Sequence, residues 1–529
     1  MSTLLMLVGA ICLLFHRCTP HCNRCTISQS VFVTSVCKCA GSSFSGDSLL
    51  THDIVALTLL ILLAIPAQPQ QAASPGVTRN LEALVGKDDW ARLPVRLQEL
   101  NSDIRNQGLH DFPGATGEML TGYKYGEYYD WDLYFENLYL SYYGVSDYDL
   151  TNLKVFLDHQ QPDGFISRTI GITYPKPTQM FKPFMAQLVV LSAKQNGNSY
   201  DWLRGNYYTR LQKYVDRWFE YDADHNGLPV WDSADASGMD NQVSRSGEIG
   251  ALQDEGVDLA CYLVRELQAM SMIARALGDT TNEEKYTQHA KRLSALINKV
   301  FWDDKDGFYY DRNEKTGKQI HIKSVAGFIP LWIGIASPRQ ARRLVHEHLL
   351  NKEEFWLPYA VATYAKTEPD YYQGVRAGEC NWRGSSWIPA NYMIFHGLLR
   401  YGFRGEAREL ALKSFDMALD RNQVTREFYD ADSGKGNGMN PFWGWSALAY
   451  VMIFDLEENY DPTELAGPVR PLLRDVLGIR FNRRRIFSRS GSAGCTRRNA
   501  DSRTCSEGSV AGSEERGADT QGCRDRSEG

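Results

Sequence analysis

Apolar residues recur at helical spacing through the middle of the chain, from about residue 85 to residue 456. The stretch 257–278 (VDLACYLVRELQAMSMIARALG) shows the pattern well, because its apolar side chains lie three and four positions apart and a glycine ends it. The same test predicts twelve helices. Their approximate ranges are 85–107, 131–143, 146–160, 181–196, 205–221, 255–278, 282–301, 322–334, 338–349, 384–400, 403–421 and 443–456.

The connections between these helices are alternately long and short. Short connections join neighbouring helices into antiparallel hairpins, so every long connection then opens at the same end. The predicted fold class is therefore all-α, an (α/α)6 toroid whose long loops share one rim. An irregular helical solenoid is the structural alternative, but sequence repeats of about 20–50 residues are not evident. The six long loops span 108–130, 161–180, 222–254, 302–321, 350–383 and 422–442.

The two ends of the chain differ from this helical body. Residues 1–77 are Cys-rich and hold two apolar runs, 4–15 and 54–65, which are short for a membrane span and lack a basic flank. This head is either signal-like or anchor-like, which implies export or membrane attachment, or an artefact of the gene model, which leaves the protein cytoplasmic. Residues 479–529 are rich in Ser, Gly, Arg and Glu, which predicts a disordered tail. The folded domain is therefore assigned to 78–478.

The composition favours a sugar-like pocket over a nucleic-acid surface. A formal net charge of −7 does not suit a phosphate backbone, which needs a basic face. Twelve Trp and 28 Tyr combine flat rings with polar edges, which suits stacking on sugars, although most of them fill helix interfaces. The body holds only Cys261 and Cys380, and the Cys22-x2-Cys25 spacing in the head lacks well-placed His partners. We therefore expect neither a metal nor another cofactor.

Residues 221–245 (YDADHNGLPVWDSADASGMDNQVSR) form a long acidic loop between two helical segments. Turn formers and short polar side chains disfavour helix and buried strand here, and long loops inside a compact domain are usually functional. The loop begins like a calcium loop, with Asp222-x-Asp224-x-Asn226-Gly227, but the twelfth position is Ser233 instead of Glu. A tight turn is therefore favoured over calcium. The five aspartates are Asp222, Asp224, Asp232, Asp235 and Asp240.

The other long loops add acids, cations and aromatic residues to the same rim. Asp130 and Asp132 end the first loop, where Asp130 also suits a helix N-cap, and the fourth loop reads as a structural hairpin. Two acids among aromatic residues suit a glycosidase, in which one carboxyl protonates the leaving oxygen and the other activates water or attacks carbon. Spacing alone selects no pair. Further candidates are Arg168, Tyr174, Lys176, Gln179 and Lys182, then Trp356, Tyr371, Tyr372, Trp382, Arg383 and Trp387, and finally Glu427, Trp443 and Trp445.

Four segments resemble known glycosidases. The segments WDSADASGMDN (231–241), CNWRGSSWIPANYMIFHGLLRYG (380–402) and EFYDADSGKGNGMNPFWGWSALAY (427–450) resemble the compact branch of glycoside hydrolase family 63. GEYYDWDLYF (126–135) resembles the first signature of the trehalases, which share the clan. The resemblance implies an (α/α)6 catalytic domain that hydrolyses α-glycosides with inversion.

The resemblance also implies which carboxyls act. It makes Asp240 the general acid and Glu427 the general base, with their carboxyl groups about 6.5–9.5 Å apart to leave room for water. We then expect the pKa of Asp240 to be raised, so that this residue keeps its proton near neutral pH.

A substrate class follows from the same resemblance. The resemblance implies a compact member, and these act on glucosylglycerate and mannosylglycerate. The large processing glucosidases carry an extra N-terminal β-sandwich, for which we expect no room between residue 78 and the first motif. The glycerate carboxylate needs a cation, for which Arg168, Lys182 and Arg383 are candidates. An oligosaccharide α-glucosidase or a trehalase-like hydrolase is the alternative. The expected substrate-binding residues are Tyr128, Trp131, Asp132, Arg168, Gln179, Lys182, Trp231, Trp382, Arg383 and Trp443.

Two other classes of function remain open. An (α/α)6 toroid also suits a sugar epimerase with paired His bases, but neither His225 nor His321 lies in a motif. A silent sugar-binding protein is the third reading, against which the intact Asp240 and Glu427 motifs count. The expected partner is a small sugar-containing substrate and no nucleic acid, with membrane contact only if the N-terminal apolar segment is a real anchor. Oligomeric state and the choice of glucose or mannose stay open.

Overall fold

The computed structural model describes residues 75–122, 127–171, 179–231, 235–245, 254–376 and 380–482. The predicted head and tail lie almost wholly outside these ranges, and so do the candidates Tyr174, Lys176 and Asp232. Within the described ranges, no helix combines the length and the apolar character that crossing a bilayer requires.

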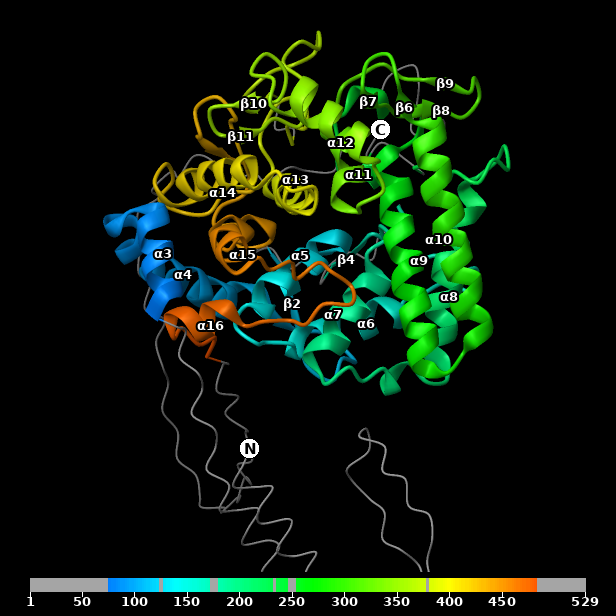
Figure 1. Ribbon diagram of the computed structural model, residues 1–529. Coiled ribbons are helices and arrows are strands. Elements are labelled where there is room, and N and C mark those ends of the chain that lie inside the picture. The colour runs from blue at the N-terminus through cyan, green and yellow to red at the C-terminus, as the bar shows by residue number, and fades with distance from the viewer. Residues whose placement is uncertain are drawn as a thin grey trace, which may run out of the picture. The chain divides into compact units, whose positions relative to one another are not determined.

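An inner ring of helices forms the centre of the fold (Figure 1). Each helix packs against the next in chain order, and the turn before the last one returns to the first, so the ring closes. Most of their residues are buried on every side, which explains why their sequences are apolar almost all round. The ring consists of α5 (Asp130–Ser141), α7 (Met185–Gln195), α9 (Val257–Leu277), α11 (Ile329–Trp332, after η7, Val325–Phe328), α13 (Ile388–Arg400) and α15 (Met452–Glu458, after η9, Trp445–Tyr450).

Outer helices alternate with the inner ones along the chain. They are amphipathic: α10, for example, buries Tyr286, Ala290, Leu293 and Ile297, which lie three or four positions apart, and packs along α9. The alternation confirms the predicted (α/α)6 toroid, and all twelve predicted helices are present with shifts of a few residues. The outer helices are α4 (Lys87–Asp103, followed by η1, Ile104–Gly108), α6 (Asp147–Asp158), α8 (Asn206–Trp218), α10 (Thr280–Val300), α12 (Pro338–Arg343, followed by η8, Leu344–Leu349) and α14 (Arg404–Leu419).

Short elements in the connections and at the ends escaped the periodicity test. Two helices, α3 (Pro75–Val85) and α16 (Leu472–Leu477), frame the body, and brief 3-10 turns interrupt the loops. The fourth long loop contains the expected hairpin. Antiparallel strand pairs are β1 (Leu109–Asp111) with β2 (Glu118–Leu120), β3 (Glu127–Tyr129) with β4 (Thr169–Gly171), β5 (Asp254–Glu255) with β8 (Arg312–Asn313) and β8 with β9 (Lys318–Gln319), β6 (Trp302–Asp303) with β7 (Phe308–Tyr309), β10 (Trp356–Leu357) with β11 (Ala360–Val361), and β12 (Phe428–Tyr429) with β13 (Gly436–Asn437).

Two of these pairs join one long loop to the next. In β3–β4, Tyr128 pairs with Ile170, which ties the first loop to the second. In β5–β8, Glu255 pairs with Arg312, which ties the end of the third loop to the fourth. The long loops are therefore fastened to one another as well as to the helices below them.

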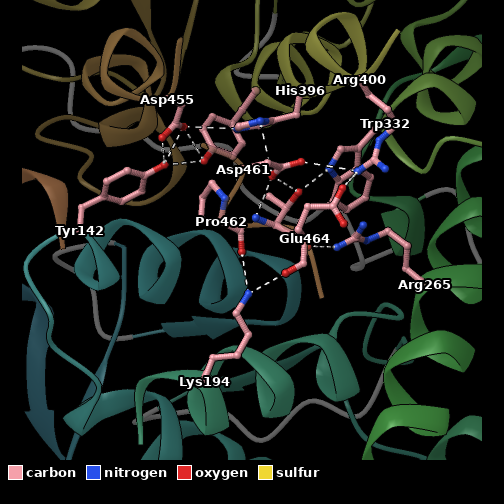
Figure 2. Close-up of polar contacts among 12 residues, drawn as sticks. Tyr142, Lys194, Arg265, Trp332, His396, Arg400, Asp455, Asp461, Pro462 and Glu464 are labelled. Carbon is pink, nitrogen blue, oxygen red and sulfur yellow. Dashed lines mark hydrogen bonds and ion pairs between the residues drawn. The ribbon is translucent and has the colours of Figure 1, made fainter. Parts of the chain in front are cut away.

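A network of polar side chains closes the toroid at the C-terminal ends of the inner helices (Figure 2). His396 on α13 lies 3.4 Å from carboxylate oxygens of both Asp455 and Asp461. On α7, Lys194 donates hydrogen bonds to the carbonyls of Pro462 and Glu464, at 3.2 and 2.7 Å. The segment after α15 is thereby fixed across this end, and the opposite rim, where the inner helices begin, carries the long loops.

Candidate active site

Glu427 lies directly before β12 and is held from several directions. Its Oε2 accepts a hydrogen bond from the backbone N–H of Met439 at 2.8 Å, and its carbonyl accepts one from Trp445 Nε1 at 3.0 Å. Burial raises the pKa of Glu427 to about 7, the Met439 N–H opposes this, and the charge of Asp240 adds to it. The two carboxyls are therefore close enough to interact electrostatically.

Asp240 lies on the turn between η4 (Asp235–Ser237) and η5 (Val243–Arg245). Its side chain keeps 29% of its surface exposed, whereas Glu427 is only 7% exposed, so Asp240 is the more accessible acid. Arg168 Nη2 lies 3.7 Å from Asp240 Oδ1. A cation at this distance favours the ionised carboxyl.

The residues after Asp240 are fastened to the fifth loop. Asn241 Oδ1 accepts a hydrogen bond from the Trp382 backbone N–H at 2.8 Å, and Asn241 Nδ2 donates one to the Tyr372 hydroxyl at 2.9 Å. Gln242 Nε2 donates to the Trp382 carbonyl at 2.6 Å. The position of Asp240 is therefore set by a loop more than a hundred residues away in the sequence.

Asp132 provides a third carboxyl from the first turn of α5. It is buried, and its Oδ1 has no hydrogen-bond partner among the described residues. Burial raises the pKa of Asp132 to about 8; Lys182 and Arg168 lower it, and Glu427 raises it further. Asp132, Asp240 and Glu427 thus form one electrostatic cluster. An orphaned buried oxygen of this kind suits a sugar hydroxyl as its partner.

Stacked aromatic rings form a wall beside the acids. Trp382 stacks on Trp387 with ring centroids 4.0 Å apart and an interplanar angle of 14°, and Trp387 stacks on Phe428 at 4.7 Å and 13°. Trp131 lies 6.0 Å from both Trp382 and Trp445. Trp382 Nε1 is buried and lacks a hydrogen-bond partner in the described part of the chain, so the wall holds one unsatisfied polar donor beside its flat faces.

A family profile described as the mannosylglycerate hydrolase MGH1-like glycoside hydrolase domain matches residues 125–446. This range covers more than half of the 529 residues and includes Asp132, Asp240 and Glu427. The chain belongs to this glycoside hydrolase family. The family and the motifs agree with the resemblance to glycoside hydrolase family 63.

Two curated relatives show how the likeness is distributed. The chain is 33% identical over 235 residues to the cytosolic neutral trehalase of Kluyveromyces lactis, a match that covers 41% of this chain and 30% of that one. It is 34% identical over 150 residues to the mannosylglycerate hydrolase of Thermus thermophilus, covering 28% and 33%. The chain therefore spans about a third of the length of the curated relatives it matches.

Solved structures share the fold. The mannosylglycerate hydrolase of glycoside hydrolase family 63 from Thermus thermophilus, in complex with glucose, superposes with a TM-score of 0.53 at 20% identity, covering 68% of this chain and 99% of that one. Neutral trehalase from Saccharomyces cerevisiae gives 0.51 at 17%, covering 72% and 85%. At these identities the likeness establishes the (α/α)6 toroid of the MGH1-like domain but not its substrate.

Within this domain, Arg168 lies beside Asp240, and Gln179 and Arg383 contact its neighbours. Arg168 Nη1 donates to Gln179 Oε1 at 3.3 Å, and the Arg168 guanidinium lies 5.6 Å from the centre of the Tyr129 ring. Arg383 Nε donates to the carbonyl of Asn241. Arg168 therefore faces the acid, and Arg383 supports the turn that carries it.

Four expected sugar-binding residues have different surroundings. Tyr128 packs edge-on against His110 and Phe112, with centroids 6.5 and 6.1 Å apart, because side chains alternate along β3; its neighbour Tyr129 faces Arg168 instead. The other three are buried and engaged elsewhere: Lys182 Nζ with Asp130 Oδ1 at 2.9 Å, Trp231 Nε1 with Asp258 Oδ1 at 3.3 Å, and Trp443 Nε1 with the Thr121 carbonyl. These contacts are with the scaffold.

Two further expectations concern individual aspartates. Asp130 is not an N-cap: Tyr129 occupies that position without a side-chain cap, and Asp130 binds Lys182 and the Trp131 N–H. Asp222 does form a tight turn, since its oxygens accept hydrogen bonds from the N–H groups of Asn226 and Gly227 at 3.0 and 2.9 Å.

Sequence reasoning missed several residues that shape the site. Asn241 and Gln242 directly follow the predicted acid, and their position in the SGMDNQ segment was the available signal. Another missed residue is Tyr129, which faces Arg168 in place of the predicted Tyr128. Glu136, one helical turn after Asp132 on α5, is also buried, and burial together with Asp132 holds the pKa of Glu136 well above its usual range.

Proposed function

We propose that this protein hydrolyses a small α-glycoside with inversion at the anomeric carbon. The observation that carries the proposal is the pairing of a partly exposed Asp240 with a buried Glu427 whose pKa is raised to about 7, beside an aromatic wall. In the proposed mechanism Asp240 gives its proton to the glycosidic oxygen as the bond breaks. Ionised Glu427 takes a proton from the water that attacks from the opposite face.

The remaining side chains have supporting roles in this proposal. Asp132, with an unpartnered buried oxygen, receives a sugar hydroxyl, and Trp131 and Trp382 pack against the ring. Lys182 holds Asp130 at the start of the same helix, which fixes Asp132 in place. The carboxyls of Asp240 and Glu427 are expected about 6.5–9.5 Å apart.

For the substrate we propose mannosylglycerate or glucosylglycerate. The family description and the Thermus thermophilus relative support this class, and a neighbouring crystal structure of the mannosylglycerate hydrolase is described in complex with Tris and D-glycerate. Arg168 is the cation best placed for a glycerate carboxylate, because its guanidinium already lies beside Asp240. A substrate carboxylate on Arg168 would weaken its hold on ionised Asp240 and so favour the protonated acid that the mechanism needs.

A trehalase-like hydrolase or an oligosaccharide α-glucosidase is the second candidate, supported by the neutral trehalase match. A sugar epimerase is less well supported: in the described structure His225 lies exposed on a turn, while exposed His321 packs against Tyr310, so the two do not flank Asp240 and Glu427. A silent binding protein would bind the same sugars without turnover.

The test is to incubate the purified protein with mannosylglycerate, glucosylglycerate, trehalose and short α-glucans and to follow the released sugar by NMR. Inversion predicts that the β-anomer appears first. Asp240→Asn and Glu427→Gln should each abolish turnover of the accepted substrate while the protein stays folded. First release of the α-anomer, or an active Asp240→Asn variant, would refute the mechanism. Preferred turnover of trehalose would select the second candidate.

A further inference from the structure

Arg245 lies five residues after Asp240 and is almost completely buried, with 1% of its side chain exposed. Its guanidinium donates two hydrogen bonds to Asp258, at 3.0 and 2.7 Å, one to Asp254 at 3.3 Å and one to Asp311 at 3.3 Å. One cation thus holds three buried carboxyls, none of which is among the proposed reacting groups.

The same cluster holds the other end of the acidic loop. Trp231 Nε1 donates to Asp258 Oδ1 at 3.3 Å, and the Trp231 backbone N–H donates to the Asp254 carbonyl at 3.4 Å. Residues 231 and 245 are therefore both fixed to the first turn of α9. The turn that carries Asp240 lies between these two attachment points.

The carboxyls that receive Arg245 are themselves fixed. Asp258 Oδ1 accepts the Leu259 N–H at 2.8 Å, and Asp311 Oδ1 accepts the Val257 N–H at 2.9 Å, so both are attached to the start of α9. Ser244 Oγ donates to Asp311 Oδ2 at 3.0 Å. Packing is tight: a Cβ on Gly256 would lie 2.6 Å from both Asp258 Oδ1 and Trp231 Nε1.

This arrangement is a costly way to gain stability. Burial of charged groups offsets much of the attraction between them, and hydrophobic replacements of such clusters are often as stable. Here the acids outnumber the cation, and burial raises the pKa of Asp254 well above its usual range, with Asp311 adding to the effect. The cluster instead fixes the orientation of the Arg245 side chain, because a guanidinium bound to two oxygens of one carboxyl has a single orientation.

We infer that Arg245 is a positioning residue that orients the Asp240 carboxyl toward the glycosidic oxygen, because Arg245 and Trp231, on either side of Asp240 in the chain, are both fixed to the first turn of α9. Arg245 itself touches no substrate. The inference rests on the proposed role of Asp240 as proton donor. A displacement of about 1 Å at a proton donor lowers rates by about 100-fold, so the loop need not unfold for its misplacement to matter.

The test compares two substrates of the same sugar: mannosylglycerate, whose leaving oxygen needs a proton, and α-mannosyl fluoride, whose leaving fluoride needs little help, with the glucosyl pair run alongside. For Arg245→Met we expect kcat on the glycerate substrate to fall about 100-fold, with kcat on the fluoride within about 5-fold of wild type and KM nearly unchanged. Arg245→Lys keeps the charge but not the two-oxygen contact, so its kcat on the glycerate substrate should lie between those of wild type and Arg245→Met. Asp311→Asn is a milder change in the cluster. It should change the ratio of kcat on the glycerate substrate to kcat on the fluoride in the same direction but by less.

A matched control is Arg265→Met. Arg265 lies on α9, roughly 10 Å beyond Asp258 along the helix axis at 1.5 Å per residue, and it stacks 4.1 Å from Trp332 in the network at the closed end (Figure 2). It is also a buried arginine, so its loss should lower Tm as Arg245→Met does. Both substrates should then change by the same factor.

The outcomes separate this inference from the proposed function. Asp240→Asn must show the same dependence on the leaving group; if it does not, the proposed function is wrong and the inference falls with it. The other contrary outcome is that Asp240→Asn shows the dependence while Arg245→Met and Asp311→Asn lower kcat equally on both substrates or leave it unchanged on both. Arg245 is then structural only, and the inference alone is overturned.

Discussion

The backbone N–H of Trp382 donates a hydrogen bond of 2.8 Å to Oδ1 of Asn241, although 141 residues separate them in the chain. This contact joins the residue after the proposed acid to the aromatic wall. The proposed proton donor and the proposed stacking surface are therefore tied together by this hydrogen bond. The alignment of Asp240 with the Trp382 ring therefore depends on both the third and the fifth long loop.

Asn241→Ala tests that link. It leaves the Trp382 N–H without its partner, which should cost about 1–3 kcal/mol of stability, and it should lower kcat about 10-fold or more by loosening Asp240. Urea unfolding and steady-state kinetics measure the two effects. Asn282→Ala is the matched control, because the half-buried Asn282 side chain bonds to Asp279 at the start of α10. Wild-type kcat in Asn241→Ala would contradict the prediction.

Glu427→Gln should stabilise the protein, and more so at high pH. The pKa of Glu427 is raised to about 7 in the folded state from an ordinary value of 4.5, mainly by burial. The stability linked to the raised pKa is full below 4.5 and is lost as pH rises through 7. At pH 8 the glutamine variant should therefore be more stable by on the order of 2–3 kcal/mol, with little difference at pH 4.5. Tm measured across this range checks it, and a constant difference would contradict it.

The pH profile of kcat/KM should have an acid limb near pH 7, because Glu427 must lose its proton to act as base. Since the charge of Asp240 contributes to the raised pKa of Glu427, Asp240→Asn should move this limb to lower pH. The variant is assayed with a glycosyl fluoride, which tolerates loss of the acid. An unmoved limb would show that Asp240 does not act on Glu427 electrostatically.

Gly438→Ala should damage the site through the base. Gly438 has φ +70°, and a Cβ there would overlap Oε2 of Glu427 and lie 2.8 Å from Phe428. Gly402→Ala is the matched control, because Gly402 has φ +82° with nothing within 4 Å of its added Cβ. Both variants should lose about 1 kcal/mol or more from backbone strain, but only Gly438→Ala should lose most of its activity. Equal activity in the two would contradict the prediction.

The helices followed from the sequence because each outer helix carries its own 3.6-residue pattern, as α10 shows with Tyr286 and Ile297. The position of Tyr128 did not follow. The direction of its side chain depends on the pairing of β3 with β4, which begins some forty residues later. No local sequence pattern predicts that pairing. Lys182 is predicted to bind substrate because its charge is visible in the sequence, whereas its ion pair with Asp130 forms only in the folded chain.

The pair of acids shows the same limit. Asp240 and Glu427 lie on different loops, and many other acids share the rim, so spacing alone selected neither. The motifs selected them through resemblance. What the motifs did not reveal is how Asp240 is held, since Arg245, Asp258 and Trp231 meet only in the folded chain.

The shared direction of the inner helices has a further consequence for charge. Each helix carries a macrodipole with its positive end at the loop rim and its negative end at the closed base. Three buried acids follow this polarity: Asp132 and Asp258 lie in first turns, and Glu266 accepts the Ala186 N–H at the start of α7. Two basic side chains, Lys194 and Arg400, lie in last turns at the other end. At the loop rim this polarity favours the carboxylates of Asp132 and Asp258, and acid–base chemistry on a sugar is proposed at the same rim.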